Sequence, residues 1–268
     1  MLPTVIIQAR MGSTRLPGKV MLEILGKPVL WHVINRVSRA KLISGVIVAT
    51  TTKKEDDVIA DFCKKNGIPV YRGSEDDVLD RYYQCAKQYN IRDIVRITAD
   101  CPLHDPNIID LVIKEYLKGG YDYVSNTIQY TFPEGVDVEV FSFKVLEEAW
   151  RHAKLPSERE HVTTYILKNE KFKKKNVTAS KKYPLYHLSL DRPEDYIFIT
   201  KIYEGIGKEM FYLEDVIRYL EEHPDLIKIN QHVKINEGYL KSLKQDEIFL
   251  KSIRRGKNEN KKRNRTME

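Results

Sequence analysis

The sequence predicts an α/β fold in which an open, mostly parallel β-sheet carries helices on both faces. Short runs of β-branched and aromatic residues recur through the first half of the 268-residue chain. Between these runs lie segments whose apolar residues repeat at helical spacing. This alternation implies right-handed βαβ crossovers. In such open sheets, ligands bind beyond the carboxyl ends of the strands.

The first half of the chain contains four runs typical of strands buried on both faces, at residues 4–8, 45–50, 93–98 and 121–125. Amphipathic patterns predict helices that include residues 29–37, 58–63, 78–86 and 109–116. Beyond residue 126 the pattern is looser. It predicts strands at 136–142 and 186–191, and helices at 143–153, 157–169 and 192–206. The lysine-rich segment 170–185 is interpreted as an excursion from the main sheet.

The charge distribution separates a nearly neutral main part from a basic end. The chain has a formal net charge of +7, but residues 251–268 hold eight cations and two acids. We therefore predict a single domain over residues 1–250 and a disordered basic tail over 251–268, because so few apolar residues cannot offset the entropy of ordering. The tail is interpreted as a solubilising end; the alternative is a contact with RNA or polyphosphate.

Cysteine usage and hydropathy favour a cytoplasmic protein with no membrane contact. The three cysteines, Cys63, Cys85 and Cys101, are far apart and form no CxxC pair, which argues against a disulfide framework and a zinc site. No window approaches the roughly 18 consecutive apolar residues of a spanning helix.

The loop leaving the first predicted strand concentrates cations at the ligand-binding edge of the sheet. Residues 8–20 read QARMGSTRLPGKV and match neither the dinucleotide-binding nor the P-loop fingerprint. Arginine binds phosphate oxygens bidentately and lysine supplies a movable point charge, so this loop suits a triphosphate. The alternative is a solvated basic turn. The candidate ligands are Arg10, Ser13, Arg15 and Lys19.

Carboxylates elsewhere in the chain suggest partners for this loop. Asp100 follows the strand 93–98 and therefore faces the same crevice, where a hard cation bridging phosphate oxygens needs an oxygen ligand. The alternative is a cap of the following turn. Asp137 and Glu139 are two residues apart on a predicted strand, so both are expected on one face. Such a pair can receive sugar hydroxyls or form a solvated edge.

The run QARMGSTRLPGK resembles the amino-terminal motif of the cytidylyltransferases that activate 3-deoxy-2-ulosonic acids and sialic acids. The resemblance is greatest to the SpsF-like branch named for spore-coat polysaccharide. It extends in the correct order over about residues 4–205. The further matching segments are 71–84, 95–106, 132–142, 158–166 and 188–196.

The resemblance implies a Rossmann-like nucleotidyltransferase sheet of the GT-A-like kind. It also implies a reaction in surface polysaccharide biosynthesis: CTP and an acidic sugar give a CMP-sugar and pyrophosphate, with Mg²⁺ required. A homodimer is expected by the same resemblance, with residues 143–185 as the candidate contact region. Preference for cytosine is likewise inherited from the family.

The resemblance also assigns roles to individual residues. The expected triphosphate ligands are Arg10, Ser13, Arg15 and Lys19, and Arg10, Lys19 and Asp100 are expected to be catalytic. The expected further nucleotide contacts are Arg72, Gly73 and Ser74. The expected Mg²⁺ ligands are Asp100 and Asp191; Asp191 is alternatively a helix N-cap. The expected acceptor ligands are Asp137, Glu139 and His161, although a lone histidine on a helix is more often structural.

Two other functions are compatible with parts of the sequence. A nucleotide-sugar-dependent glycosyltransferase also uses aspartates and a metal at strand ends, but it needs no strongly cationic first loop. An RNA- or polyanion-binding protein would act through the basic tail, yet the cations at positions 10, 15 and 19 lie outside that tail. The identity of the acceptor is left open, since Arg192 replaces the small residue more common in the family. No residue is required to be the general base.

Overall fold

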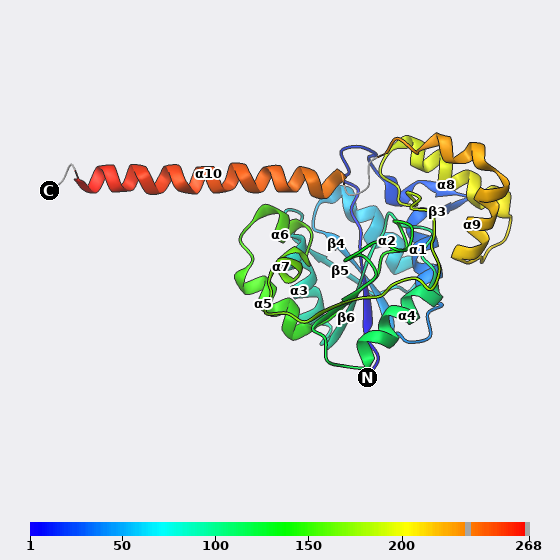
Figure 1. The fold of residues 1–268 in the computed structure, drawn as a ribbon, viewed down its shortest axis with the longest axis horizontal. Helices are drawn as coiled ribbons and strands as arrows, with labels where there is room; N and C mark the ends of the chain where they lie inside the picture. Colours follow the sequence, from blue (N-terminus) through cyan, green and yellow to red (C-terminus); the bar gives the residue numbers. More distant parts are fainter. Residues whose placement is uncertain (234–236, 266–268) are drawn as a thin grey trace.

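A computed structural model of the chain describes residues 1–233 and 237–265; for residues 254–265 it describes the backbone alone. Seven strands form one sheet in the order β5–β4–β1–β6–β8–β7–β9 (Figure 1). The strands are β1 (Thr4–Gln8), β4 (Gly45–Thr51), β5 (Val70–Gly73), β6 (Asp93–Thr98), β7 (Tyr123–Ser125), β8 (Glu139–Ser142) and β9 (Lys174–Asn176). Strand β8 runs antiparallel to both of its neighbours, and the other pairings are parallel. The predicted α/β fold with a mostly parallel sheet is confirmed.

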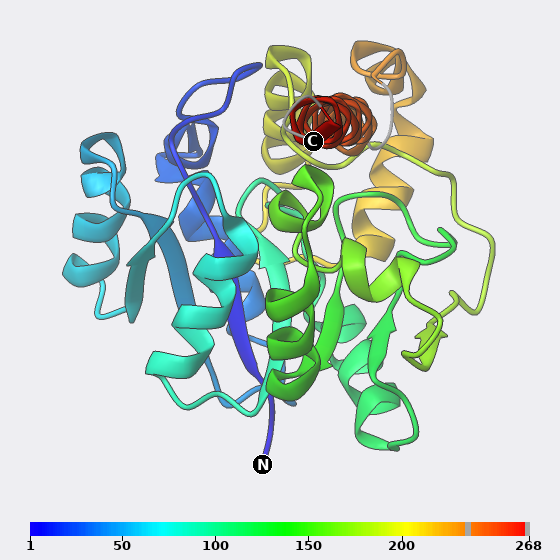
Figure 2. The same ribbon diagram turned by 90° about the vertical axis from the view of Figure 1, so that its left-hand side faces the viewer.

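Helices cover both faces of this sheet (Figure 2). They are α1 (Val29–Val37), α2 (Asp57–Lys65), α3 (Val78–Gln88), α4 (Pro106–Leu117), α5 (Phe143–His152), α6 (Pro156–Glu160), α7 (Thr164–Lys168), α8 (Pro193–Ile206), α9 (Leu213–Glu222) and α10 (Glu237–Arg265). Short 3-10 turns are η1 (Lys19–Met21), η2 (Lys54–Asp56) and η3 (Pro224–Ile229). A small hairpin pairs β2 (Glu23–Ile24) with β3 (Lys27–Pro28).

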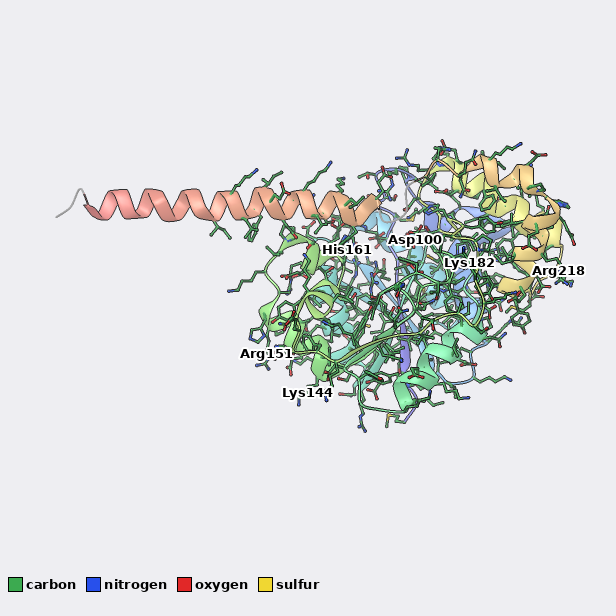
Figure 3. The ribbon with its side chains drawn as sticks, in the orientation of Figure 1. Asp100, Lys144, Arg151, His161, Lys182 and Arg218 are labelled. Atoms are coloured by element: carbon green, nitrogen blue, oxygen red, sulfur yellow. The ribbon has the colours of Figure 1, made fainter. Side chains whose placement is uncertain are left out.

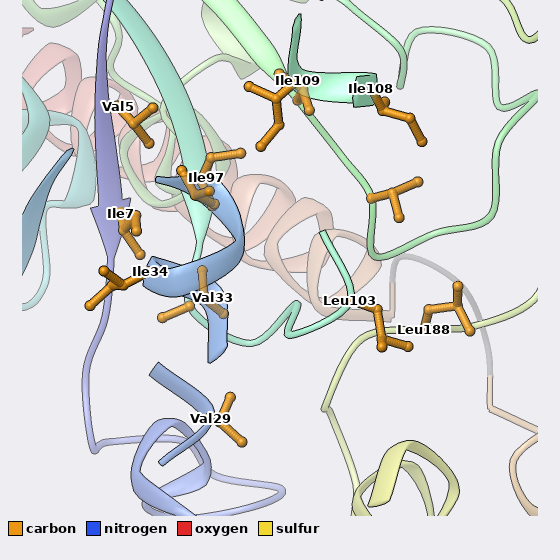
Figure 4. Close-up of a cluster of buried hydrophobic side chains, with 14 of the residues drawn as sticks. Val5, Ile7, Val29, Val33, Ile34, Ile97, Leu103, Ile108, Ile109 and Leu188 are labelled. Carbon is orange, nitrogen blue, oxygen red and sulfur yellow. The ribbon is translucent and has the colours of Figure 1, made fainter. Parts of the chain in front are cut away.

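Alternation along β1 explains why the core has two halves. Val5 and Ile7 belong to the cluster on one face of the sheet, and Ile6 belongs to the cluster on the other. On the first face, Val29 and Val33 of α1 are fully buried in the same cluster (Figure 4). Because β1 lies between β4 and β6, its carboxyl end opens at the middle of the sheet. The loop that follows β1 therefore begins next to the ends of its neighbours.

Two predicted elements differ in the structure. Residues 186–191 form no strand. The β-pairing of this segment consists of one isolated bridge, from His187 to Glu134. The segment instead connects two others, because Leu188 N donates to Glu134 O (2.9 Å) and Leu190 N donates to Asp100 O (2.8 Å). The helix predicted at 157–169 is divided into α6 and α7 around Val162, whose φ of 59° cannot continue a right-handed helix.

The carboxyl-terminal half departs from the prediction in two further ways. Segment 170–185 is not wholly an excursion, because its strand β9 pairs with β7 at the sheet edge. Residues 251–265 are helical rather than disordered, since α10 runs across the predicted boundary at residue 250 and projects from the main part of the molecule (Figure 1). Extending an existing helix adds one hydrogen bond per ordered residue without a new nucleus, and lysine and arginine are good helix formers. Residues 266–268 lie outside the described residues.

No helix within the described ranges is both long enough and apolar enough to cross a membrane.

Gly135 allows the segment containing residues 187 and 188 to approach the sheet. Its φ is +100°, and a Cβ built there would lie 2.5 Å from the carbonyl carbon of Leu188. Gly119 also has positive φ, at +80°, but a Cβ there would meet nothing within 4 Å. Substitution of Gly119 would therefore cause backbone strain alone, whereas substitution of Gly135 would cause both backbone strain and a steric clash.

Gly135→Ala is expected to lower the free energy of unfolding by about 1–3 kcal/mol more than Gly119→Ala, because overpacking adds to backbone strain. Gly119→Ala should lower the free energy of unfolding by only about 1–2 kcal/mol, the cost of placing an alanine in the left-handed backbone conformation. Urea denaturation of both variants measures the difference. Equal losses would mean that the approach of Leu188 to Gly135 is not tight.

Candidate active site

A pocket of about 350 Å³ opens at the carboxyl ends of β1 and β6. Its walls come from the loop after β1, the amino-terminal end of α3, the segment 134–137, the turn after α6, the segment 189–191 and the first turn of α10. The predicted site residues among its lining are Arg10, Ser13, Arg15, Lys19, Asp100, Asp137, His161 and Asp191. In Figure 3, Asp100 and His161 lie beneath the start of α10, whereas Lys144 and Arg218 lie toward the outside of the molecule.

The ammonium group of Lys19 joins the carboxylates of two distant segments. Its Nζ lies 2.6 Å from Asp100 Oδ2 and 3.1 Å from Asp191 Oδ1. It also donates to the carbonyl oxygen of Leu190 at 2.6 Å. Lys19 begins η1 directly after Gly18, whose φ of 70° turns the chain at this point. Residues far apart in sequence therefore share one cation.

Burial and charge act in opposite directions on these groups. Burial alone would raise the pKa of Asp100, but the charge of Lys19 and the hydrogen bond from its ammonium lower that pKa to about 2. Burial would likewise lower the pKa of Lys19, yet the charges of Asp100 and Asp191 raise it above the usual value. Asp100 and Lys19 are thus both charged at neutral pH.

Arg15 extends this charged cluster toward the pocket mouth. Its Nη2 donates to Asp191 Oδ1 at 2.7 Å, and its Nε lies 3.8 Å from Glu237 Oε2 at the start of α10. Arg192 also pairs with Glu237, at 2.8 Å. The residue at which this sequence departs from the family pattern therefore contacts the start of α10, and it is not among the described residues that line the pocket.

Asp56, which the sequence analysis did not single out, holds the root of the loop after β1. Its carboxylate accepts from Met11 N at 2.6 Å and from the hydroxyl of Thr51 at the end of β4. Gly18 N then donates to Met11 O at 2.9 Å and closes the loop. Only 1% of Asp56 is exposed, so this anchor is enclosed by the protein.

The three further nucleotide contacts are not brought into the pocket. Arg72 pairs with Asp57 at 2.6 Å and donates to the carbonyls of Thr51 and Lys53, both at 2.8 Å. Gly73 ends β5, and Ser74 Oγ accepts from the backbone N–H of residue 77. Within the described residues, these groups stabilise the turn around β5 and do not line the pocket.

The predicted acceptor ligands separate into two groups. Asp137 lines the pocket, whereas Glu139 is buried and accepts from Arg96, Tyr123 Oη (2.5 Å) and Thr163 Oγ1 (2.6 Å). Glu139 is not among the described lining residues, because β8 begins there and pairs it with Arg96. The prediction that Glu139 contacts the acceptor therefore has no support from its position.

Asp137 and His161 are the predicted acceptor ligands that face the pocket. Burial, together with the charges of Glu134 and Glu139, raises the pKa of Asp137 to about 8. Its Oδ1 is buried without a hydrogen-bond partner among the described residues. Nε2 of His161 is 2.9 Å from Ser242 Oγ on α10, and burial lowers the pKa of His161. A ligand is therefore the natural partner for Asp137.

Two arginines that the sequence analysis did not single out also line the pocket. Arg81 is 1% exposed on α3, and Arg96 lies within β6. The Nε atoms of both are buried without partners among the described residues. A signal was present in each case: Arg81 interrupts the apolar stripe of a helix, and Arg96 interrupts an apolar strand. Interior charges of this kind are rare unless they are paired or functional.

His187 joins two buried acids beneath the pocket. Its Nδ1 is 2.5 Å from Glu134 Oε2, and its Nε2 is 3.4 Å from Asp195 Oδ2. The same Asp195 oxygen accepts from the backbone N–H groups of Asp191 (3.0 Å) and Arg192 (2.8 Å). Burial opposes protonation of His187, but the hydrogen bonds that its ring nitrogens donate to Asp195 and Glu134 raise its pKa to about 10. An imidazolium thus stabilises the turn that carries Asp191.

The described residues include no cluster of three or more histidine, cysteine, aspartate or glutamate side chains arranged to hold a metal ion. Asp100 and Asp191 nevertheless fit a hard cation, because both already direct a carboxylate oxygen at one positive charge. Mg²⁺ is commonly held by one or two carboxylates together with substrate phosphates and water. These two residues are therefore suitable for a cation that arrives with a nucleotide.

The parallel sheet, the cationic loop after its central strand and the paired carboxylates define a nucleotidyltransferase. A cytidylyltransferase from Leptospira borgpetersenii serovar Hardjo-bovis superposes with a TM-score of 0.81 at 36% identity, covering 88% of this chain and 99% of that one. The CMP:2-keto-3-deoxy-manno-octonic acid synthetase complexed with CTP has the same fold, with a TM-score of 0.60 at 17% identity over 76% of this chain and 99% of that one.

The sequence comparisons assign the family. The family described as cytidylyltransferase matches residues 4–222. The spore coat polysaccharide biosynthesis protein SpsF of Bacillus subtilis is 33% identical over 229 residues, which cover 82% of this chain and 94% of that protein. A 3-deoxy-manno-octulosonate cytidylyltransferase of Geobacter sulfurreducens is 41% identical over 112 residues, covering 41% of this chain and 43% of that one. The chain belongs to the cytidylyltransferase family, and the resemblance predicted from its motifs is confirmed.

His187→Gln is expected to lower the free energy of unfolding at pH 7 by about 3–5 kcal/mol, because it leaves two buried acids without their cation. In the unmodified protein, the histidine contribution is fully present below its unfolded pKa of about 6.5. Between that pH and about 10 the folded protein holds a proton that the unfolded chain has lost, so stability falls as pH rises.

The measurement is urea denaturation of both proteins from pH 6 to 10. The stability difference between them should shrink with rising pH, by at most about 1.4 kcal/mol per pH unit. His152→Gln, which alters a half-exposed histidine on α5, serves as the control and should leave the slope unchanged. A stability difference that does not vary with pH would contradict a charged His187.

Proposed function

We propose that this cytidylyltransferase transfers CMP from CTP to an acidic sugar, with release of pyrophosphate, in the biosynthesis of a surface polysaccharide. The observation that carries the proposal is the cluster of Lys19, Asp100 and Asp191 beside the arginines of the first loop. The names of SpsF and of the 3-deoxy-manno-octulosonate cytidylyltransferases support the acceptor class and the pathway. A homodimer and a cytoplasmic location remain expectations from the family.

In the proposed reaction an acceptor oxygen attacks the α-phosphorus of CTP in line, and the bond to the pyrophosphate oxygen breaks. Negative charge then accumulates on the leaving pyrophosphate. Arg10, Arg15 and Lys19 neutralise this charge, and Ser13 with the loop amides positions the phosphates. No covalent intermediate with the protein is needed, so catalysis consists of positioning and electrostatic stabilisation.

Asp100 and Asp191 are the proposed holders of Mg²⁺. Bound there with the nucleotide, the ion would supply Lewis-acid stabilisation of phosphoryl oxygens and help to orient the acceptor. Asp195 assists this pair by accepting from the backbone N–H of Asp191. The half-buried carboxylates of Asp100 and Asp191 thus need no large rearrangement to direct oxygens at a cation.

Asp137 and His161 are the proposed acceptor ligands. Asp137 offers a buried oxygen without a protein partner, which a sugar hydroxyl can satisfy. His161 lies beside Tyr239 of α10, with ring centroids 5.4 Å apart. The first turn of α10 therefore contributes to the acceptor side of the pocket. A glycosyltransferase is less well supported, because it has no pyrophosphate for the cationic loop to stabilise.

The direct test incubates the full chain with Mg²⁺, each of four nucleoside triphosphates and a panel of acidic sugars, and follows pyrophosphate release. Release is expected with CTP and at least one acidic sugar. Asp100→Asn should lower kcat by roughly a hundredfold or more, as loss of an electrostatic contact to the reacting phosphates does in other enzymes. Asp61→Asn, at an exposed position of α2, is the matched control. Pyrophosphate release that does not depend on an acidic sugar would overturn the proposal. A preference for a nucleoside triphosphate other than CTP would also overturn it.

Arg15→Met removes a positive charge from the loop after β1, and Arg72→Met removes the same charge from strand β5. Arg15 lines the pocket and Arg72 does not, so only Arg15→Met should raise the KM for CTP. A lost charge-assisted hydrogen bond of about 1.5–3 kcal/mol corresponds to a rise of roughly tenfold to a hundredfold. Steady-state kinetics with varied CTP measures both variants. A comparable rise for Arg72→Met would restore residues 72–74 as nucleotide contacts.

A further inference from the structure

The ammonium of Lys19 occupies the place where the two proposed metal ligands converge. Three oxygens surround it: one from each carboxylate and the carbonyl of Leu190, at 2.6–3.1 Å. The side chain of Lys19 is only 11% exposed, so water can contribute little to its solvation. The same carboxylate oxygens would have to contact a divalent cation held by Asp100 and Asp191.

We propose that Lys19 is an internal counter-ion of the Asp100–Asp191 pair, and that a divalent cation therefore binds this pair only together with the nucleotide. This inference rests on the proposed function, since it concerns the order in which the same site is filled. It assigns Lys19 a role in the free enzyme in addition to its role toward the triphosphate.

Electrostatics makes the two cations competitors in the absence of nucleotide. An ion pair in a partly buried site is strong only while its geometry is intact, and an unpartnered buried charge is costly. A metal ion entering alone would have to displace the ammonium from both carboxylates and leave it in a pocket that already contains other cations. The other arginines and lysines in the described lining of the pocket are Arg10, Arg15, Arg81, Arg96 and Lys241. Metal binding to the free enzyme is therefore opposed.

A bound triphosphate removes this electrostatic obstacle to metal binding. It brings several negative oxygens next to Arg15 and Lys19, so the displaced ammonium gains new acceptors. Lysine has a flexible four-carbon stem and three donors, which allow it to change partners without movement of the backbone. Lys19 begins η1 directly after Gly18 and is one of the residues that line the pocket. The carboxylates are then free for the cation that accompanies the phosphates.

The test is a titration of nucleotide-free protein with Mn²⁺, in which free Mn²⁺ is measured by electron paramagnetic resonance. Lys19→Met is expected to bind Mn²⁺ at least tenfold more tightly than the unmodified protein, a difference of about 1.4 kcal/mol. Lys144→Met removes an equal charge from an exposed site away from Asp100 and should bind like the unmodified protein (Figure 3). The double variant Lys19→Met with Asp100→Asn should not show this increase in Mn²⁺ affinity.

Each outcome decides for or against the proposal. Equal affinities of the unmodified protein and Lys19→Met overturn it, and so does a gain that persists in the double variant. Micromolar binding of Mn²⁺ to the unmodified free protein also overturns it. If Lys19→Met does not fold, Lys19→Gln makes the same charge change with a polar side chain. Because no nucleotide is present, failure of this titration is distinct from absence of pyrophosphate release, which would refute the proposed function instead.

Discussion

The site depends on one ammonium group held between two carboxylates that come from distant parts of the chain. Lys19, Asp100 and Asp191 belong to the first loop, the end of β6 and the turn before α8. Taking three charged groups out of water carries a desolvation cost that only close geometry can offset. The surrounding structure therefore has to hold all three segments together, and much of its polar interior serves that purpose.

Three buried supports hold these segments. Asp56 anchors the loop after β1, and the backbone bond from Leu190 N to Asp100 O joins two of the charged segments directly. Asp195, paired with His187, fixes the turn that carries Asp191. Each support leaves the carboxylates of the site free to meet a cation. The chain thus separates groups that position the site from groups that can react with a ligand, which is what electrostatic catalysis requires.

The central strands and first helices were predictable because their signals are local. The alternation of β1 side chains between the two faces of the sheet and the helical spacing in α1 follow from side-chain geometry within a few residues. The strand predicted at 186–191 was wrong for a physical reason: its apolar residues are buried in the core, but its backbone bonds separately to Glu134 and Asp100 and forms no continuous ladder with one strand. The division between α6 and α7 at Val162 and the helical extension to Arg265 likewise depend on packing and propagation that periodicity does not report.

The sequence by itself determined the parallel strands of the first half and the cationic loop that follows β1, because the alternation of strand and helix patterns and the motif spacing are properties of the chain. Only the tertiary structure decided which polar residues line the pocket. It directed Arg72 and Glu139 to internal partners and brought Arg81, Arg96 and the start of α10 to the pocket wall. The sequence alone does not distinguish a charged side chain that pairs inside the protein from one that lines the pocket. The role of such a side chain depends on which oppositely charged group lies within a few ångströms, and that proximity exists only after folding.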